Sequence, residues 1–443
     1  MEMDRVANQN PWWADGSAIT DDEKVKKVLD TGSKIDAALE EKNQVLIGPR
    51  QLGKTTALKY DIYKKIVNKH VNPKQIMYYS FDTSRRFEEI YDVISIFVGE
   101  GQARTFLYLD EVSFVDEWQR AVKSFLDSSK SLNSVLYITG SSSINLRKEL
   151  MPGRKIKFIE FMPLSFKEFL ISFGSEDVKQ FLKKNIAVDL DSAIRLAEKA
   201  VAYFEEIRKW FSVYLITGGY PDAIFDYMAN KRVSDAVYDI HWNAFVSDIS
   251  KAGRSVEIAT AIIYGLIESY ASKVNLSKIA RMQGIKSHVT VRDYIEMFDD
   301  LFVAKGIFPI AGRKYVFRKE RKVYFSDPFL YNLFAKKTNI IDKDAESKIA
   351  EGVLFNHLYR FANKGRQLAE PKVNIGFYSG KREVDFVVGE YGFESKWRNE
   401  VTSYDFPDVG IKNKILLSKK TVEKESRQNR VKILPLFMLL AVL

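Results

Sequence analysis

The stretch Gly48-Pro-Arg-Gln-Leu-Gly53-Lys54-Thr55 matches the phosphate-binding pattern G-x-x-x-x-G-K-[ST] at every position. The apolar run Val45-Leu46-Ile47 precedes it and predicts a strand, while residues 56–67 are predicted to form a helix. Glycines let the backbone curl so that successive N–H groups face phosphate oxygens, and the helix N-terminus adds its dipole. This stretch therefore predicts a nucleoside triphosphate site.

Two side chains of the loop have predicted chemical roles. Lys54 is expected to reach the β- and γ-phosphates as a catalytic residue, and the Thr55 hydroxyl to ligate Mg²⁺. The other predicted nucleotide-binding residues are Gly48, Pro49, Arg50, Gln51, Leu52, Gly53 and Thr56. ATP and Mg²⁺ are the cofactors that this pattern predicts.

A second signal is Phe106-Leu-Tyr-Leu-Asp110-Glu111, an apolar run that ends in two carboxylates. A buried strand would deliver Asp110 to its C-terminal edge as a metal ligand, and Glu111 could polarise the attacking water. One predicted strand, residues 76–81, lies between the two motifs in sequence. Both features suit the P-loop class with an added central strand and a catalytic glutamate, to which AAA-type ATPases belong.

The next predicted strand, residues 135–139, ends in Gly140-Ser-Ser-Ser143. A polar side chain at this strand end would lie beside the γ-phosphate. Ser141 is the first choice for this sensor position in the catalytic set, and Thr139 is the second.

Two arginines follow this strand, Arg147 and Arg154. Either could act as an arginine finger across a subunit interface, and Arg154 is assigned to the catalytic set. A finger of this kind would require a homo-oligomer. An ordinary surface arginine is the alternative for each.

Composition limits the remaining function classes. The chain has 443 residues, which suggests about three domains, and no cysteine, which excludes disulfides and cysteine-based metal sites. The four histidines lack metal-ligand spacing. A formal net charge of +10 favours an anionic partner, most simply nucleic acid, with a lysine-rich ion-paired surface as the alternative. No apolar signal segment or membrane span is evident, so a cytoplasmic protein is expected.

Several motifs together resemble the archaeal ATPases of the AAA superfamily. They are Gly140-Ser-Ser-Ser143, Gly153-Arg154, Pro163-Leu-Ser-Phe-Lys-Glu168-Phe, Gly218-Gly219-Tyr220-Pro221 and Asp248-Ile-Ser-Lys251. The resemblance covers nearly the whole chain. It implies a helical lid on the nucleotide site and a C-terminal nuclease-like domain of the PD-(D/E)xK kind.

Residues 261–340 are expected to form a winged helix. Leu276–Ala280 begins a helix with Ser277 as its predicted cap, a turn follows at Gly284, and residues 288–298 form the second helix. Strands are predicted at 301–309 and 314–325. The candidate DNA contacts are Lys278, Lys286, Ser287, His288, Thr290 and Arg292. Duplex or branched DNA is the expected partner, although winged helices also serve as protein-contact modules.

A hairpin is predicted in the last part of the chain, turning at Gly389-Glu-Tyr-Gly392. With Glu390-Tyr391 as its two-residue turn, Asp385 would face Lys396, and Glu394 would share their face of the sheet. A helix opening near Glu351 would add a further carboxylate.

These residues resemble a PD-(D/E)xK active site, with Val384 where the strict pattern has proline. Glu351, Asp385 and Glu394 are the predicted ligands of Mg²⁺ or Mn²⁺, and Lys396 is the predicted catalytic lysine. Two alternatives stay open. One is an exposed hairpin with a charge-paired Asp385, and the other is a nuclease fold that binds without cutting.

The predicted architecture is an α/β P-loop ATPase core with a parallel AAA-like sheet, a helical lid, a winged helix and a restriction-endonuclease-like α/β domain. The expected segments are a lead-in at 1–20, the core at 21–165, the lid at 166–260, the winged helix at 261–340 and the nuclease-like domain at 341–443. The last residues, 433–443, are expected to form a buried strand. The expected function is ATP-dependent binding and processing of DNA. The alternative is a nucleotide-controlled switch that binds DNA or a protein partner without cleavage.

Overall fold

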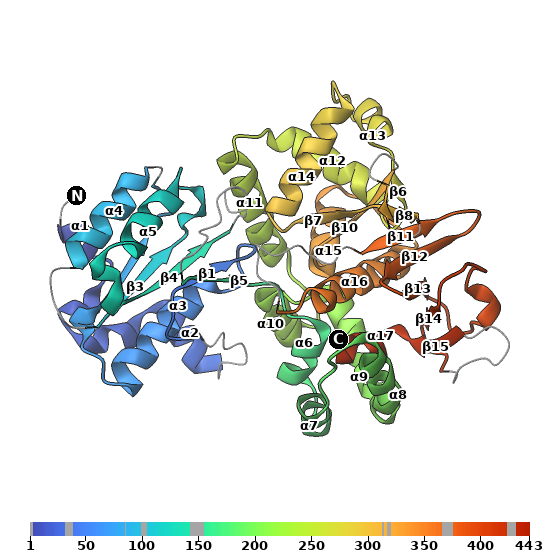
Figure 1. The fold of residues 1–443 in the computed structure, drawn as a ribbon, viewed down its shortest axis with the longest axis horizontal. Helices are drawn as coiled ribbons and strands as arrows, with labels where there is room; N and C mark the ends of the chain where they lie inside the picture. The colour runs from blue at the N-terminus through green and yellow to red at the C-terminus, as the bar shows by residue number, and fades with distance from the viewer. Residues whose placement is uncertain are drawn as a thin grey trace. The chain divides into compact units, whose positions relative to one another are not determined.

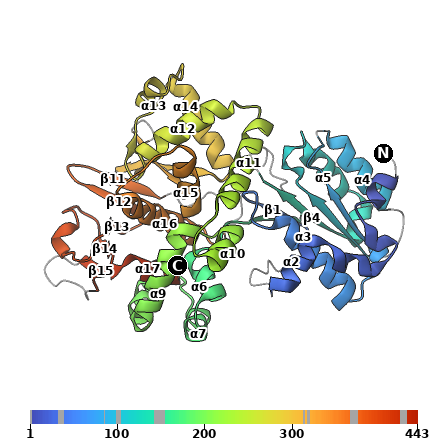
Figure 2. The same ribbon diagram turned by 180° about the vertical axis from the view of Figure 1, so that it is seen from behind.

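The computed structural model describes residues 3–31, 39–84, 86–98, 104–141, 155–311, 314–316, 320–365, 375–422 and 431–443. The chain divides into two compact units, the first ending at Met162 and the second running from Pro163 to Leu443 with a break after Arg366. Figure 1 and Figure 2 show both units from opposite sides.

A parallel sheet forms the centre of the first unit, with strand order β2-β3-β4-β1-β5. Its strands are β1 (Gln44–Ile47), β2 (Ile76–Ser80), β3 (Thr105–Asp110), β4 (Ser134–Gly140) and β5 (Lys157–Glu160). Because β4 lies between β1 and β3, the sheet contains the added central strand that the sequence predicts.

Helices cover both faces of this sheet. They are α1 (Met3–Ala7), α2 (Glu23–Thr31), α3 (Lys54–Tyr63), α4 (Phe87–Phe97) and α5 (Trp118–Leu126). The ribbon places α2 and α3 on one face and α4 and α5 on the other (Figure 1). Leu58 and Ile62 of α3 pack in one buried cluster with Tyr108 and Tyr137 of the sheet. This packing fixes α3 directly behind the phosphate-binding loop.

The N-terminal segment protects β2, which is an edge strand. The Asn10 side chain accepts a hydrogen bond from the Tyr78 N–H (2.6 Å) and donates one to the Tyr78 carbonyl (2.8 Å). The indoles of Trp12 and Trp13 donate to the carbonyl of Ile76 at 3.1 and 2.7 Å. Side chains thus satisfy backbone groups that an exposed edge would offer to another strand. The predicted lead-in is therefore part of the first unit's packing.

The second unit begins with a helical region. Its helices are α6 (Phe166–Phe173), α7 (Glu176–Lys184), α8 (Leu190–Lys199), α9 (Phe204–Thr217), α10 (Pro221–Asn230), α11 (Asp235–Lys251) and α12 (Val256–Glu268). Helices α6, α8 and α9 pack against the C-terminal helix α17 (Leu436–Val442). The Nε2 atom of His357 accepts a hydrogen bond from the Phe166 N–H at 2.8 Å. The region predicted as a lid therefore packs within the second unit.

A three-helix segment with a small antiparallel sheet follows. Its elements are α12, β6 (Lys273–Val274), α13 (Leu276–Met282), α14 (His288–Asp300), β7 (Ala304–Ile307) and β10 (Arg321–Phe325). The strand order is β6-β10-β7. Asn275, not the predicted Ser277, caps α13, because its side-chain oxygen accepts the Lys278 N–H at 2.8 Å. Gly284 has a φ of 65°, as a tight turn between the helices requires.

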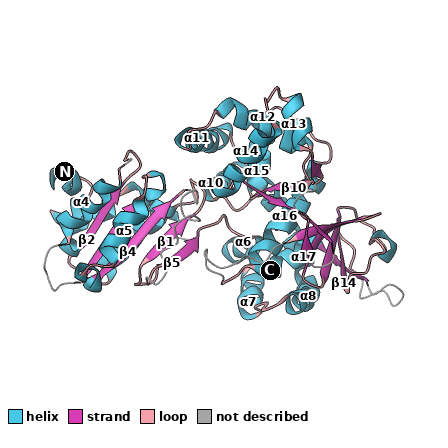
Figure 3. Ribbon diagram, turned by 45° about the horizontal axis from the view of Figure 1, so that its top comes forward, coloured by secondary structure: helices cyan, strands magenta, loops and turns pink. Residues whose placement is uncertain are grey.

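A seven-stranded mixed sheet completes the second unit, with order β15-β14-β13-β12-β11-β8-β9. Its strands are β8 (Pro309–Ala311), β9 (Lys314–Tyr315), β11 (Gly376–Ser379), β12 (Glu383–Val388), β13 (Tyr391–Lys396), β14 (Asn413–Ser418) and β15 (Val431–Pro435). Helices α15 (Pro328–Lys337) and α16 (Ala345–Ala362) lie between β10 and β11 in the chain. Figure 3 distinguishes these strands from the surrounding helices.

The sequence-based expectation of one terminal strand is wrong. The apolar run is divided at Pro435, where β15 ends and helix α17 begins. Proline suits this position because it lacks a backbone N–H and is tolerated where a helix starts. All seven residues of α17 are buried.

Candidate functional sites

The phosphate-binding loop connects β1 to α3, and two of its residues have positive φ angles, 61° at Gln51 and 90° at Gly53. Gly48 is required for a different reason, because a Cβ there would lie 1.8 Å from the carbonyl oxygen of Phe161. All nine predicted nucleotide-binding residues lie in this loop or the first turn of α3. The loop has the local geometry of a phosphate cradle.

Lys54 lies across the loop. Its ammonium group donates hydrogen bonds to the carbonyl oxygens of Gly48 and Pro49, both at 2.7 Å. The side chain is buried, with 5% of the residue exposed. The lysine is therefore held over the position where the loop would enclose a phosphate.

Asp110 ends β3 and is almost fully buried. The Thr55 hydroxyl and the Tyr78 hydroxyl each donate to its Oδ2 atom at 2.8 Å, and the Thr139 hydroxyl donates to Oδ1. A carboxylate beside hydroxyl oxygens matches the ligands that Mg²⁺ prefers. Thr55 and Asp110 therefore fit a Mg²⁺ ion that would neutralise phosphate charge.

Glu111 forms hydrogen bonds with residues at the end of β4. The Ser141 hydroxyl donates to its carboxylate, and the Glu111 N–H donates to the Thr139 hydroxyl oxygen at 2.9 Å. Arg50 lies 3.5 Å from the Glu111 carboxylate and 3.6 Å from that of Asp82. Both residues chosen for the sensor position thus contact the acidic pair. Arg147 and Arg154 lie outside the described residues, and their roles stay predictions.

Sequence reasoning missed two partners of the acidic pair. No sequence pattern points to Tyr78, and the loop motif indicates only a nucleotide-binding role for Arg50. Tyr78 lies on β2, which pairs with β3, so knowledge of the strand order would have indicated it. The Arg50 contact depends on how the loop folds over the end of β3, which no local pattern reports.

The C-terminal hairpin forms with a different register from the predicted one. Its two-residue turn is Gly389-Glu390, and Val388 faces Tyr391. Gly389 takes a φ of 59°, which glycine adopts at no steric cost, so the turn falls one residue earlier. The register therefore shifts by two residues and places Asp385 opposite Glu394. A two-residue shift preserves the faces, so the predicted acidic side chains still converge.

The predicted C-terminal site residues do come together. The Lys396 ammonium pairs with Glu394 at 2.6 Å, not with Asp385, and the Asp385 N–H donates to Glu394 at 3.2 Å. Asp385 also accepts the Ser395 N–H at 2.9 Å. Burial and the charge of Asp385 raise the pKa of the Glu394 carboxyl and that of the Glu351 carboxyl.

A lysine that the sequence reasoning missed lies inside this cluster. The Lys322 ammonium is 2.7 Å from Glu383 and 3.4 Å from both Glu351 and Asp385. Although burial lowers its pKa, the three carboxylates raise the pKa of Lys322 well above its ordinary value. The Tyr324 hydroxyl donates to Glu351 at 2.6 Å. Residues 322 and 324 lie two positions apart on one strand, so their side chains point to the same face of the sheet. This alternation is the sequence signal that could have indicated both residues.

This arrangement does not fit the predicted Mg²⁺ or Mn²⁺ ion. Mg²⁺ needs oxygen ligands at about 2.0–2.1 Å, and here a lysine ammonium lies between the carboxylates. Within the described ranges, no group of three or more His, Asp or Glu side chains could hold a metal ion. The assignment of Glu351, Asp385 and Glu394 as metal ligands is therefore not supported.

The six predicted DNA contacts lie on α13, on α14 and in the turn between them. Lys278, Lys286, His288 and Arg292 are exposed, while Ser287 and Thr290 are half-buried. Ser287 caps α14 by accepting the Val289 N–H at 3.1 Å. Arg292 pairs with Asp293 at 3.1 Å, which reduces the positive charge of this face. These side chains lie together along one short stretch, and their partner stays a prediction.

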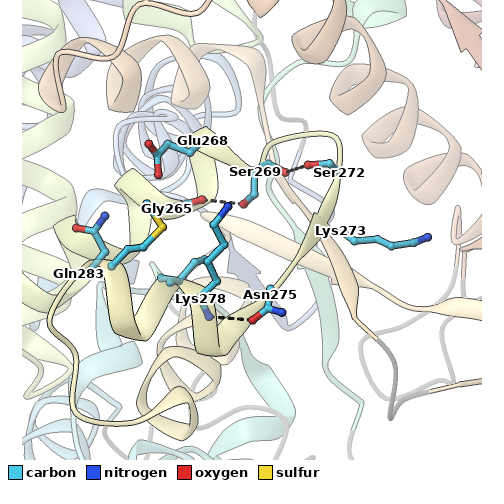
Figure 4. A pocket seen from close by; sticks show the side chains of 10 residues that line it. Gly265, Glu268, Ser269, Ser272, Lys273, Asn275, Lys278 and Gln283 are labelled. Atoms are coloured by element: carbon cyan, nitrogen blue, oxygen red, sulfur yellow. Dashed lines mark hydrogen bonds between the residues drawn. The ribbon is translucent and has the colours of Figure 1, made fainter.

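A pocket is lined by residues of α12, β6 and α13. It is lined by Gly265, Glu268, Ser269, Ser272, Lys273, Asn275, Lys278, Ile279, Met282 and Gln283. Figure 4 shows the Lys278 side chain extending across it toward Ser269. The lining includes one carboxylate and two lysines, which gives the pocket mixed charge.

The sheet order, the loop and the acidic pair define the first unit as a P-loop ATPase domain of the AAA type. Residues 40–170 match the family model described as AAA domain (AAA_14). Residues 208–340 match a second model, a domain of unknown function (DUF8612). This second segment runs from within α9 to just beyond α15.

Two curated relatives match over most of the chain. An uncharacterized protein of Methanocaldococcus jannaschii is 26% identical over 375 residues, which cover 81% of this chain and 70% of the relative. An uncharacterized protein of Haemophilus influenzae is 26% identical over 300 residues, covering 64% of this chain and 66% of the relative. The chain thus spans about two thirds of the length of both relatives.

Solved structures share only a distant likeness. Aeropyrum pernix ORC1 in complex with DNA gives a TM-score of 0.31 at 13% identity, covering 72% of this chain and 92% of that one. A Thermotoga maritima RuvB variant gives 0.24 at 16% identity, covering 72% and 93%. Likenesses this weak carry no argument about function.

In the part of the chain that the structure describes, no helix is long and apolar enough to cross a membrane.

Proposed function

We propose that this chain hydrolyses ATP at the phosphate-binding loop and uses the nucleotide cycle to control DNA binding by its second unit. One observation carries the ATPase part: Thr55 is hydrogen-bonded to Asp110, and Ser141 to Glu111, at one edge of a parallel sheet. This edge also holds the loop and the start of α3. Together they supply ligands for Mg²⁺, a phosphate cradle and a carboxylate for the attacking water.

Each residue has a proposed task. Lys54 exchanges its bonds to the loop carbonyls for bonds to the β- and γ-phosphates, since these are the stronger acceptors. Glu111 orients and polarises water, while Ser141 holds its carboxylate. Arg154 from a second copy is the proposed arginine finger, which would make the active form a homo-oligomer.

DNA binding is proposed for the segment from α12 to β10, interpreted as a winged helix. The support is its order of three helices and a three-stranded sheet, with α14 preceded by a turn in which Gly284 and Lys286 are exposed. Lys278 and Lys286 are exposed on this side, where they could neutralise phosphates. The chain's net charge of +10 favours the same partner.

Cleavage of DNA is not part of this proposal. The seven-stranded sheet with α16 is proposed to be a nuclease-like domain that binds DNA without cutting it. Support comes from Lys322, whose ammonium lies among the acids that a nuclease would use to hold metal.

The test is ATP turnover by the full chain, with and without duplex or branched DNA, beside the Glu111→Gln variant. We expect DNA to raise wild-type turnover several-fold. Loss of the catalytic carboxylate should lower kcat by about 100-fold or more while ATP binding survives. Unchanged turnover in Glu111→Gln would refute the catalytic assignment.

A nucleotide-controlled switch that docks on a protein is the second candidate. The observation in its favour is the pairing of Arg292 with Asp293 and Glu296, which leaves less free positive charge on α14. Slow turnover that DNA does not stimulate would favour it. So would DNA binding that barely weakens between 50 and 200 mM salt, because phosphate contacts by several lysines must be salt-sensitive.

A further inference from the structure

Lys322 is among the most deeply buried charged side chains of the described residues, with 1% of the side chain exposed. It lies on β10 of the three-stranded sheet, while Glu383 and Asp385 lie on β12 of the seven-stranded sheet and Glu351 on α16. Neither the ATPase chemistry nor the proposed DNA contacts use it. Its burial therefore needs a separate explanation.

The chemistry of the ammonium group matches its surroundings. A lysine has three N–H donors, and three carboxylates lie within 3.4 Å of the Lys322 nitrogen. Isolated buried charges are costly, so a nearby cation stabilises the ionised acids and the acids stabilise the lysine. The fourth acid, Glu394, is paired separately with Lys396 at 2.6 Å.

We infer that Lys322 is a built-in cation that takes the place of a divalent metal in the C-terminal acidic cluster. It makes the cluster independent of Mg²⁺ and Mn²⁺ and joins β10 to β12 and α16. Lys273 of β6 adds a second link from the same small sheet, at 2.8 Å from Glu383. The proposed DNA-binding segment and the seven-stranded sheet are thereby coupled by fixed charges instead of an exchangeable ion.

The first experiment measures Mn²⁺ binding to the nucleotide-free full chain by the loss of free-ion EPR signal. We expect the wild-type chain and the Asp385→Asn variant to bind the same amount of Mn²⁺, because no Mn²⁺ occupies the acidic cluster. Mn²⁺ held at the nucleotide site would instead be lost in Asp110→Asn and unaffected by Asp385→Asn. Saturable wild-type binding that disappears in Asp385→Asn would overturn the inference, whatever the ATPase assay gives.

The second experiment replaces the internal cation. Lys322→Met should lower the thermal unfolding midpoint, because three carboxylates lose their counter-ion, and added Mn²⁺ should recover a large part of the loss. The matched control is Lys348→Met, since Lys348 pairs with Asp342 outside the cluster at 2.7 Å. The control should show no Mn²⁺ recovery. A folded Lys322→Met chain that does not respond to Mn²⁺ would contradict the inference, and if this variant fails to fold, the wild-type titration still decides.

Discussion

Asp110 is oriented by hydroxyl groups from three different elements. Thr55 comes from α3, Tyr78 from β2 and Thr139 from β4. Charge-assisted hydrogen bonds to a buried carboxylate are stronger than neutral ones, so each helps to fix its direction. At the residue scale, the proposed Mg²⁺ site therefore depends on Tyr78 and Thr139, which are not proposed metal ligands, as well as on Thr55, which is.

Removing the Tyr78 hydroxyl tests this dependence. In Tyr78→Phe we expect the Mg²⁺ concentration for half-maximal ATPase activity to rise several-fold, with a stability loss of about 2 kcal/mol. Tyr108→Phe is the matched control, since the Tyr108 hydroxyl donates to Asp61 at 2.6 Å, a carboxylate that does not contact Asp110. The control should lose similar stability and keep its Mg²⁺ requirement. Equal Mg²⁺ requirements in both variants would contradict the positioning role.

At the scale of elements, the motif Gly218-Gly219-Tyr220-Pro221 joins α9 to α10. The Gly219 N–H donates to the Asp327 carboxylate at 3.0 Å, and a Cβ on Gly219 would lie 2.1 Å from the Leu164 carbonyl oxygen. Asp327 also caps α15 by accepting the Phe329 N–H at 2.8 Å. The motif thus holds three segments of the second unit together, which is a structural role.

Gly219→Ala should destabilise the second unit by roughly 3 kcal/mol, because the added methyl meets backbone atoms that cannot move aside easily. Urea unfolding of the full chain gives the measurement. Gly410→Ala is the control, since a Cβ there has no heavy atom within 4 Å, and it should change stability by less than about 0.5 kcal/mol. Similar urea unfolding midpoints for the two variants would contradict this structural role, because the backbone around Gly219 would then accommodate the added methyl group.

At the scale of the molecule, a buried neutral histidine of the second unit joins two segments that are distant in sequence. His357 of α16 contacts the first residue of α6, 191 positions earlier in the chain. His357 accepts the Phe166 N–H at Nε2, so Nδ1 carries the proton and donates to the Val353 carbonyl at 2.8 Å. Burial and the charge of Arg360 lower the pKa of His357 from 6.5 to about 4. The unfolded chain therefore takes up a proton more readily than the folded one between pH 6.5 and 4.

Stability should consequently fall as the pH drops through this window. From pH 7 to pH 5, His357 should account for a loss of about 2 kcal/mol in the free energy of unfolding. His357→Gln provides the comparison, because an amide can keep one donor and one acceptor without titrating. Urea unfolding at both pH values should show a smaller pH effect in the variant. The same pH effect in both chains would refute this assignment.

Local patterns in the sequence were sufficient for the nucleotide-binding core. The loop residues from Gly48 to Thr56, the strand ending at Asp110 and the polar end of β4 each depend on neighbours in the chain, so short-range rules could find them. The convergence of Asp385 and Glu394 was also predictable, because strand alternation preserves the face even when the turn is placed one residue late.

Other features depend on contacts between distant segments, which only the folded chain brings together. Lys322 reaches Glu383 across 61 positions of sequence, and no local pattern indicates that its ammonium lies where a metal was expected. The burial of α17, which follows Pro435, likewise comes from packing against α6, α8 and α9, which are distant in sequence. Short-range patterns thus predicted the phosphate-binding loop and the acidic pair at the end of β3, whereas the position of the Lys322 ammonium among the buried acids follows only from long-range contacts.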